Sequence, residues 1–389
     1  MRFQKRSVGS AAVALIGLVC CVALRSAAAA APTPWPTVEW PSSTPEQQGM
    51  SSQALADLVD FGAANAMDSL LVVRHGHIVA EAYYAPFRPG LRHAVNSVTK
   101  AVVGTLTGIA FQEGALGALD QSVIDLFPDR KIANVDANKK AITLSNLLDS
   151  TSGLHWIEPL SNAPPETMLQ MRTSSDMVGF VLDRPMAQAP GLAFEYNSGT
   201  WHLLSAVLAK KTGRDTVDYA KQKLFAPLGI SDVAWRNDPQ GISIGGYGLF
   251  LQPRDMAKIG YLYLHRGQWA GQQVVPAAYV DRVRHASVDM GFGTTPSFRY
   301  ASGWWTIPDK RVFMAVGYQR QLIVVLPDVD MVVVTTGRKN YPLVRFIDRI
   351  TGAVTSQSPL PHDAGATARL TARIKEAANE KTSESALKD

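Results

Sequence analysis

The sequence predicts an α/β (α+β) protein with an antiparallel sheet flanked by helices and a mostly helical insertion in the middle of the chain. Two observations lead to this fold class. Segments with the alternation and composition of strands occur at residues 69–84 and again after residue 300. Between them, helical patterns alternate with loops rich in proline and glycine. The simplest arrangement pairs the two groups of strands in one sheet and leaves the middle segment as an insertion.

Each element follows from a local pattern. A serine ahead of apolar residues at helical spacing predicts a helix from about Ser52. Residues 69–84 predict two strands around a tight turn at His75-Gly76. The run 97–113 is apolar and contains small residues, which predicts a helix that packs deeply in the core. Four strand-like segments follow residue 300, and residues 341–354 predict the last helix.

The chain is long enough for one large domain with a substantial core, since it has 389 residues of which 46% are hydrophobic. The proline-rich segment before this domain predicts an extended leader, and the charged, alanine-rich end predicts a disordered tail. The expected parts are a signal peptide at 1–30, the leader at 31–50, a domain at 51–352 (α/β part at 51–114 and 295–352, insertion at 115–294) and the tail at 353–389.

Residues 1–30 have the pattern of an export signal. Arg2, Lys5 and Arg6 precede an apolar run that is short for a membrane span, and small residues near Ala30 provide a cleavage site. A retained membrane anchor is the alternative. Both cysteines lie in this segment, so the mature chain would have no thiol and no disulfide. We expect a periplasmic or secreted protein without a stable membrane span after cleavage.

The formal net charge is +5, and residues 1–30 contain four basic residues and no acidic one. The rest of the chain is therefore almost neutral. This composition gives no basic surface for nucleic acid, and we expect no nucleic-acid partner.

Ser97 and Lys100 are three residues apart at the start of the predicted helix 97–113. Residues with this spacing lie on the same helix face. The positive end of the helix dipole and burial both disfavour a charged ammonium there. A neutral lysine can accept the serine proton while the serine attacks a carbonyl. The alternative is a capping serine with a solvated lysine, and the same spacing at Ser385 and Lys388 in the expected tail shows that spacing alone has little weight.

The segment SVTKAVVGTLTGIAFQEG, which begins at Ser97, resembles the active-site helix of the serine β-lactamase and penicillin-binding-protein superfamily. The likeness is to the class C-like branch, which contains esterases, D-aminopeptidases and 6-aminohexanoate-dimer hydrolases. Residues 147–154 (LLDSTSGL) and 190–213 resemble motifs of the same branch, although Asp149 stands where histidine is usual. The resemblance implies a β-lactamase/transpeptidase-like fold and an acyl-enzyme on Ser97, with no cofactor and no metal ion.

The resemblance also implies a third catalytic group. The Tyr-x-Asn or Tyr-x-Ser element of the branch corresponds to Tyr196-Asn197-Ser198. A phenol beside Lys100 can exchange protons with it, as base in acylation and as acid to the leaving group. Asn197 and Ser198 are candidates for substrate contact, with a turn residue and a helix cap as their alternatives.

An oxyanion hole needs two backbone N–H groups directed at one point. One is the N–H of Ser97, and the resemblance places the other near Tyr318, at Gln321. Gln319 and Arg320 stand where the branch often has glycine. An arginine there either blocks the approach of the substrate or offers its guanidinium group to a substrate carboxylate.

Other patterns are weaker candidates. Residues 241–245 (GISIG) match the G-x-S-x-G motif around Ser243, but no strand precedes this serine and no helix follows it. His75 and His77 lack a nearby partner for a metal site. We therefore expect an exported serine hydrolase that cleaves a small-molecule ester or amide. The alternatives are a β-lactamase or D-Ala-D-Ala carboxypeptidase, and a catalytically inactive penicillin-binding-like protein.

Overall fold

A computed structural model describes residue 1 and residues 35–160 and 163–379. Its centre is an eight-stranded antiparallel sheet with the order β2-β1-β13-β12-β11-β10-β9-β8. The strands are β1 (Met67–Arg74), β2 (His77–Tyr83), β8 (Val288–Asp289), β9 (Arg299–Ala301), β10 (Trp304–Ile307), β11 (Val312–Gly317), β12 (Gln321–Leu326) and β13 (Met331–Gly337). The first strand pairs with the last, with Val72 opposite Val333. The prediction of one sheet built from both parts of the chain is confirmed.

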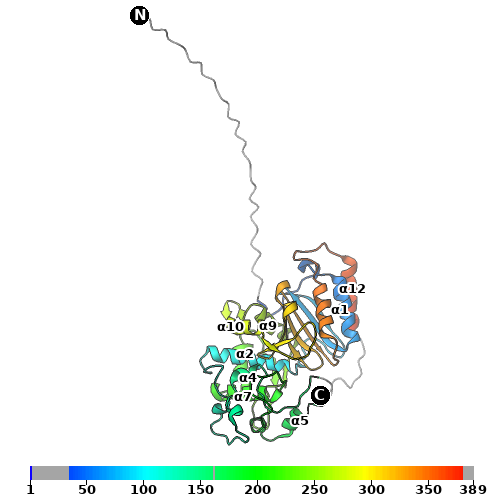
Figure 1. The fold of residues 1–389 in the computed structure, drawn as a ribbon. Helices are drawn as coiled ribbons and strands as arrows, with labels where there is room; N and C mark the ends of the chain where they lie inside the picture. Colours follow the sequence, from blue (N-terminus) through cyan, green and yellow to red (C-terminus); the bar gives the residue numbers. More distant parts are fainter. Residues whose placement is uncertain (2–34, 161–162, 380–389) are drawn as a thin grey trace. The chain divides into compact units, whose positions relative to one another are not determined.

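Helices cover both sides of this sheet (Figure 1). On one side, α1 (Ser52–Ala64) packs with α11 (Leu343–Gly352) and α12 (Ala364–Asn379). On the other, α2 (Val98–Gln112) contacts β11 and β12, and α9 (Pro253–Leu264) contacts β12 and β13. Every residue of β12 and β13 is therefore buried, as expected for strands covered on both faces.

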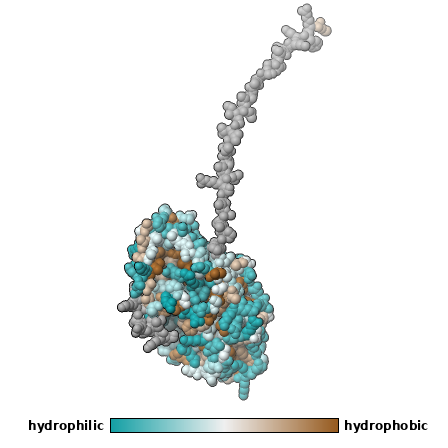
Figure 2. Space-filling model, turned by 180° about the vertical axis from the view of Figure 1, so that it is seen from behind, coloured by the Kyte–Doolittle hydropathy of each residue, from teal (hydrophilic) through white to brown (hydrophobic). Residues whose placement is uncertain are grey.

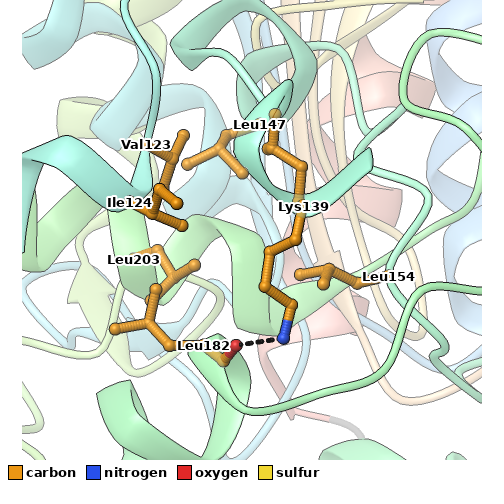
Figure 3. Close-up of a pocket in the computed structure, with 8 residues that line it drawn as sticks. Val123, Ile124, Lys139, Leu147, Leu154, Leu182 and Leu203 are labelled. Atoms are coloured by element: carbon orange, nitrogen blue, oxygen red, sulfur yellow. Dashed lines mark hydrogen bonds between the residues drawn. The ribbon is translucent and has the colours of Figure 1, made fainter. Parts of the chain in front are cut away.

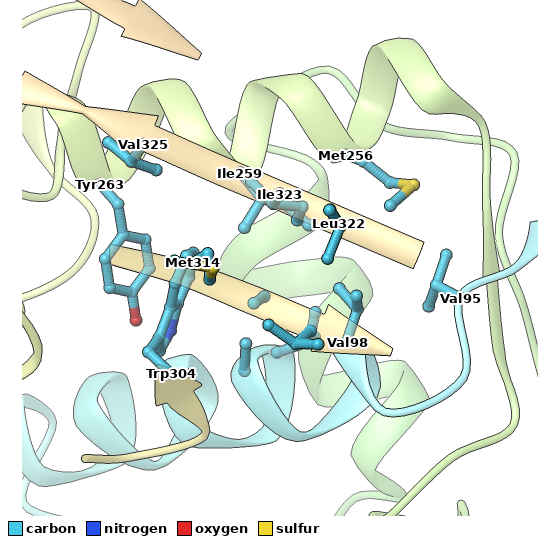
Figure 4. Close-up of a cluster of buried hydrophobic side chains, with 14 of the residues drawn as sticks. Val95, Val98, Met256, Ile259, Tyr263, Trp304, Met314, Leu322, Ile323 and Val325 are labelled. Atoms are coloured by element: carbon cyan, nitrogen blue, oxygen red, sulfur yellow. The ribbon is translucent and has the colours of Figure 1, made fainter. Parts of the chain in front are cut away.

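The core between α2, the sheet and α9 fixes the position of α2. Figure 4 shows Val98, Leu322 and Met256 in one cluster of side chains from these three elements, and all three are fully buried. Gly104 lets α2 approach a neighbouring turn closely, because a Cβ there would lie 2.3 Å from the carbonyl oxygen of Ser302. The helix that begins next to Ser97 is thus held by packing along its length.

The middle of the chain forms short helices and strands. They are β3 (His93–Ala94), α3 (Ala137–Lys140), α4 (Leu144–Leu148), α5 (Glu166–Thr173), α6 (Met177–Leu182), α7 (Ser198–Thr212), α8 (Thr216–Ala220), β4 (Ala234–Trp235), β5 (Leu249–Leu251), β6 (Gln268–Trp269), β7 (Gln272–Gln273) and α10 (Ala277–Arg284). The insertion was predicted to extend to residue 294, but α9 already packs on the sheet. Gly260 explains the contact, since a Cβ there would lie 2.6 Å from a methyl group of Val332.

The structure differs from the prediction of a disordered tail at residues 364–379, which form α12. Leu370 and Ala377 are buried, and α12 packs against α1 and β2. Ion pairs join α12 to α1, in which Arg369 contacts Asp57 and Asp60, and Arg373 contacts Asp60. The sequence pattern did not predict this helix, because its buried side is mostly alanine.

The described part of the predicted leader lies against the domain. The ring of Trp35 lies 5.5 Å from that of Tyr261 and 5.2 Å from that of Trp269, and Trp269 donates a hydrogen bond to Thr37. Except for residue 1, the predicted signal peptide lies outside the described residues. No helix in the described ranges is long and apolar enough to cross a bilayer. The face in Figure 2 carries only small, separate hydrophobic groups.

Candidate active site

Ser97 lies at the point where the chain enters α2. Asn96, with a φ of 49°, makes the turn into this helix, and Ser97 follows with a half-buried side chain. The Ser97 hydroxyl makes no capping bond to the helix. It instead accepts a hydrogen bond from Lys100 Nζ at 3.1 Å. The side chain of Ser97 is thus hydrogen-bonded to Lys100 and does not cap the helix.

Lys100 is fully buried and has three hydrogen-bond acceptors around its amine. Besides Ser97 Oγ, these are Ser198 Oγ at 2.9 Å and the carbonyl oxygen of Gly246 at 2.8 Å. Burial lowers the pKa of Lys100 to about 8, and the charge of Glu158 partly opposes this shift. A neutral amine has two hydrogens. With Ser198 and Gly246 as their acceptors, its lone pair faces Ser97 Oγ.

Glu158 determines the direction of the Ser198 hydroxyl. Its carboxylate accepts hydrogen bonds from the backbone N–H of Ser198 at 2.7 Å, from the Ser198 hydroxyl at 2.5 Å and from Trp156 Nε1 at 2.7 Å. A carboxylate can only accept, so the Ser198 hydroxyl donates to Glu158 and accepts from Lys100. The sequence did not indicate Glu158, because it lies in a loop outside the motifs.

Tyr196 lies against the same amine. Lys100 Nζ is 4.5 Å from the centre of the Tyr196 ring, and the phenol forms a hydrogen bond with the Ser97 side chain. The pKa of Tyr196 is raised well above its usual value, and burial is the largest cause. The nearby Tyr300 and Glu158 raise it further. The phenol therefore keeps its proton near neutral pH, and it is better suited to donate a proton than to accept one.

Asn197 is the cap of α7. Its side-chain oxygen accepts a hydrogen bond from the backbone N–H of Thr200 at 3.1 Å. Its amide nitrogen is buried without a hydrogen-bond partner in the described part of the chain. The structure thus brings Ser198, but not the oxygen of Asn197, into the hydrogen bonds around Lys100.

The turn between β11 and β12 lies beside Ser97. Asn96 donates a side-chain hydrogen bond to the carbonyl oxygen of Tyr318 at 3.1 Å. Gly317 allows the close approach, because a Cβ there would lie 2.5 Å from the carbonyl oxygen of Val95. The end of β11 therefore contacts the two residues that precede Ser97.

Gln321 and Arg320 use their side chains within the sheet. Gln321 Nε2 donates to the carbonyl oxygens of Gly337 at 2.6 Å and of Tyr318 at 3.1 Å. Arg320 Nε donates to the carbonyl oxygen of Tyr341 at 2.8 Å. Nε of Arg320 thus donates to the chain's own backbone, whereas the sequence left open whether this arginine blocks the substrate or binds a substrate carboxylate.

The loop with the G-x-S-x-G motif supports the site through its backbone. Ser243 is fully buried, and its hydroxyl donates to Asp215 at 2.6 Å. Gly246 packs against the start of α7, where a Cβ would lie 2.6 Å from the carbonyl oxygen of Ser198. This close packing brings the carbonyl oxygen of Gly246 to Lys100.

Asp149, which replaces the histidine usual in the resembling branch, has a structural partner. Arg282 donates to its carboxylate at 2.5 Å and to the Ser145 hydroxyl at 3.0 Å. The pair joins the end of α4 to α10. The unusual residue is thus explained by its ion pair.

Two cavities differ in their size and in the residues that line them. One, of about 10 Å³, lies among apolar side chains and Lys139, whose Nζ donates to the carbonyl oxygen of Leu182 at 2.8 Å (Figure 3). It has barely room for one water molecule. The other, of about 340 Å³, lies beside Tyr196 and has the size of a small-molecule site. Its walls are Trp156, Ile157, Glu158, Pro159, Leu160, Phe194, Glu195, Tyr196 and Phe292.

A helix-covered antiparallel sheet with a serine and a buried lysine at the start of a central helix defines the class, a serine hydrolase. The profile of the family described as Beta-lactamase matches residues 53–355. The chain therefore belongs to the β-lactamase family, as its motifs predicted.

Known proteins similar to this chain include hydrolases. It is 26% identical over 309 residues to the 6-aminohexanoate-dimer hydrolase of Paenarthrobacter ureafaciens, which covers 75% of this chain and 78% of that protein. It is 26% identical over 179 residues to Esterase EstB of Burkholderia gladioli, and this match covers 42% of this chain and 45% of that protein. A solved Bacillus anthracis structure, provisionally named a 6-aminohexanoate-dimer hydrolase, has a TM-score of 0.70 at 20% sequence identity. The match covers 83% of this chain and 89% of that chain. This last likeness confirms the predicted fold.

Proposed function

We propose that this chain cleaves a small-molecule ester or amide through an acyl-enzyme on Ser97, with Lys100 as the general base. The observation that carries the proposal is the 3.1 Å hydrogen bond between Lys100 Nζ and Ser97 Oγ at a fully buried amine. Burial lowers the pKa of Lys100 to about 8, so a useful fraction of the amine is neutral near pH 8. The names of the curated relatives support ester and amide substrates.

In the proposed acylation, Lys100 takes the proton of Ser97 while Oγ bonds to the carbonyl carbon of the substrate. The tetrahedral intermediate then expels its alcohol or amine. Tyr196 donates the proton that this leaving group needs, and Lys100 returns a proton to Tyr196. A water molecule then attacks the acyl group by the reverse sequence and releases the acid. The raised pKa of Tyr196 supports its role as the donor.

The developing negative charge needs two N–H donors. We assign the backbone N–H of Ser97 and the backbone N–H of Tyr318 in place of that of Gln321. The hydrogen bond from Asn96 to the Tyr318 carbonyl supports this choice, since it holds Tyr318 beside the residue that precedes Ser97.

The chain's own contacts favour this function over the two alternatives. β-Lactams and peptides that end in D-alanine carry a carboxylate, whereas Nε of Arg320 donates to the carbonyl oxygen of Tyr341. An inactive binding protein would not need a buried lysine in hydrogen-bond contact with a half-buried serine.

The test compares the purified wild-type chain with Ser97→Ala and Ser243→Ala on p-nitrophenyl esters, nitrocefin and linear amides. We expect Ser97→Ala to abolish turnover and Ser243→Ala to keep it, provided that the protein folds. Faster turnover of nitrocefin than of every ester and amide would favour the β-lactamase alternative.

We also propose that the protein acts in the periplasm or outside the cell. The basic residues, the short apolar run and the small residues within 1–30 support this proposal.

A further inference from the structure

The cavity beside Tyr196 has apolar walls and acidic groups. Its lining contains three aromatic side chains besides Tyr196, three aliphatic ones and two carboxyl groups, and no lysine, arginine or histidine. Leu160 and Phe292 remain exposed at 44% and 39% although both are large and hydrophobic. Exposed apolar side chains that line a cavity are typical of ligand contact.

The two carboxyl groups of this cavity have different partners. Both oxygens of Glu158 accept hydrogen bonds from Ser198 and Trp156. Glu195 accepts a hydrogen bond from the backbone N–H of Trp156, and no lysine, arginine or histidine of the described residues forms an ion pair with it. Glu195 is thus the acidic group that remains available to a ligand.

We infer that this cavity holds an apolar group of the substrate, and that Glu195 makes it select groups ending in a cation over groups ending in an anion. The inference rests on the proposed ester or amide hydrolysis at Ser97. A cation gains the attraction of Glu195 and contact with the aromatic faces of Trp156, Phe194 and Phe292. An anion meets two carboxylates and no basic group in the same walls.

The charge of Glu195 depends on pH in the working range. Burial raises its pKa to about 7. A raised carboxyl pKa means that the group is charged above pH 7 and neutral below it, so selectivity for the cation grows as the pH rises through 7. The other titratable groups in the walls are Glu158 and Tyr196, of which Glu158 is already hydrogen-bonded and Tyr196 stays neutral in this range.

The experiment uses three matched p-nitrophenyl esters, whose six-carbon acyl chains end in a methyl, a trimethylammonium or a carboxylate group. A second series of acetate esters carries the same three ends on the alcohol side, because the cavity can hold either part of the substrate. We expect the kcat/KM ratio of the cationic to the anionic ester to be roughly tenfold at pH 8.5 in one series, the size of a charge interaction near a protein surface. The ratio should fall toward 1 below pH 6.

Glu195→Gln should bring that ratio within about threefold at both pH values, in line with the loss of one charge interaction. The kcat/KM for the neutral ester is the reference against which any general loss of activity in this variant is corrected. Glu39→Gln is the matched control, since Glu39 is an exposed carboxylate in the leader outside the cavity walls. The ratio cancels the titration of Lys100, which acts on both esters alike.

Phe292→Ala tests the apolar part of the inference. It should reduce the advantage of the hexanoate ester over the acetate ester severalfold, whereas Val135→Ala, at an exposed valine outside the cavity, should not. This inference would be overturned by turnover without charge selectivity in either series. It would also be overturned if Glu195→Gln left the kcat/KM ratio of the cationic to the anionic ester unchanged. The proposed function would stand in both cases. Absence of both turnover and covalent labelling of Ser97 would overturn the two together.

Discussion

The Ser198 hydroxyl donates a hydrogen bond to Glu158 and accepts one from Lys100 Nζ at 2.9 Å. The three side chains come from a loop, the start of α7 and the first turn of α2. Their hydrogen bonds run in one direction only, because a carboxylate cannot donate. A neutral Lys100 gives its other hydrogen to the carbonyl oxygen of Gly246, which leaves the lone pair for Ser97.

Substitution of Glu158 tests this chain of hydrogen bonds. In Glu158→Gln the negative charge is lost, and the new amide can donate to Ser198. We expect kcat/KM to fall by roughly tenfold to hundredfold, the size of a lost hydrogen bond to a charged group. The charge of Glu158 raises the pKa of Lys100, so the alkaline rise of the pH–rate profile should also move to lower pH. A profile that matches the wild type and Glu39→Gln would contradict the role of Glu158.

Lys100 and Tyr196 should behave as one unit. We expect Lys100→Ala to reduce kcat/KM by about 10³-fold or more, within the range of general acid–base catalysis. Tyr196→Phe should also cost much of the rate. The double variant should be little worse than the poorer single one, because both residues move the same proton.

The measurement is kcat/KM for the four proteins on one activated ester, with circular dichroism as the control for folding. Losses that multiply in the double variant would argue against a shared proton path.

The contact of α12 with the sheet domain can be tested by stability. Leu370→Ala removes a buried side chain from the contact with α1 and β2, and should lower the free energy of unfolding by about 2–3 kcal/mol. Lys375→Ala, at an exposed position of the same helix, is the matched control and should change it by less than about 0.5 kcal/mol. Equal stability of the two variants in urea unfolding would mean that α12 does not stabilise the domain.

Export can be tested on the protein itself. The mature chain should begin near Ala31 and contain no thiol, because both cysteines lie within residues 1–30. Intact mass and thiol titration of protein recovered from the periplasm check this, with the full chain kept in the cytoplasm as the control. Two free thiols in the periplasmic protein would show that the segment is retained.

The sequence predicted those parts of the site that a continuous motif brings together. Ser97 and Lys100 lie one turn apart on α2, and Tyr196 lies in a recognisable loop. Glu158 and Gly246 were missed because each reaches Lys100 from another loop, and only the packing of α7 against these loops brings them there. The proposed second oxyanion donor also depends on such contacts, since the Asn96 side chain ties the turn at Tyr318 to the start of α2.

The fold was predictable wherever burial leaves a strong pattern. Apolar runs predicted the central strands β11 to β13, and a capping serine predicted the start of α1. Two helices were misjudged because their contacts are not apparent in the local sequence. The amphipathic α9 does not itself indicate that it packs on the sheet, and α12 attaches through alanines and ion pairs rather than through a stripe of large apolar residues.

The central claim is that Lys100 activates Ser97 as a neutral amine, and the rate at which a fluorophosphonate labels Ser97 at different pH values tests it most directly. Burial lowers the pKa of Lys100 to about 8, and only the neutral form accepts a proton. The labelling rate should therefore rise with pH around a midpoint near 8, map to Ser97 by peptide mass, and be lost in Lys100→Ala. Labelling of another residue, or a Lys100→Ala variant labelled as fast as the wild type, would contradict the claim.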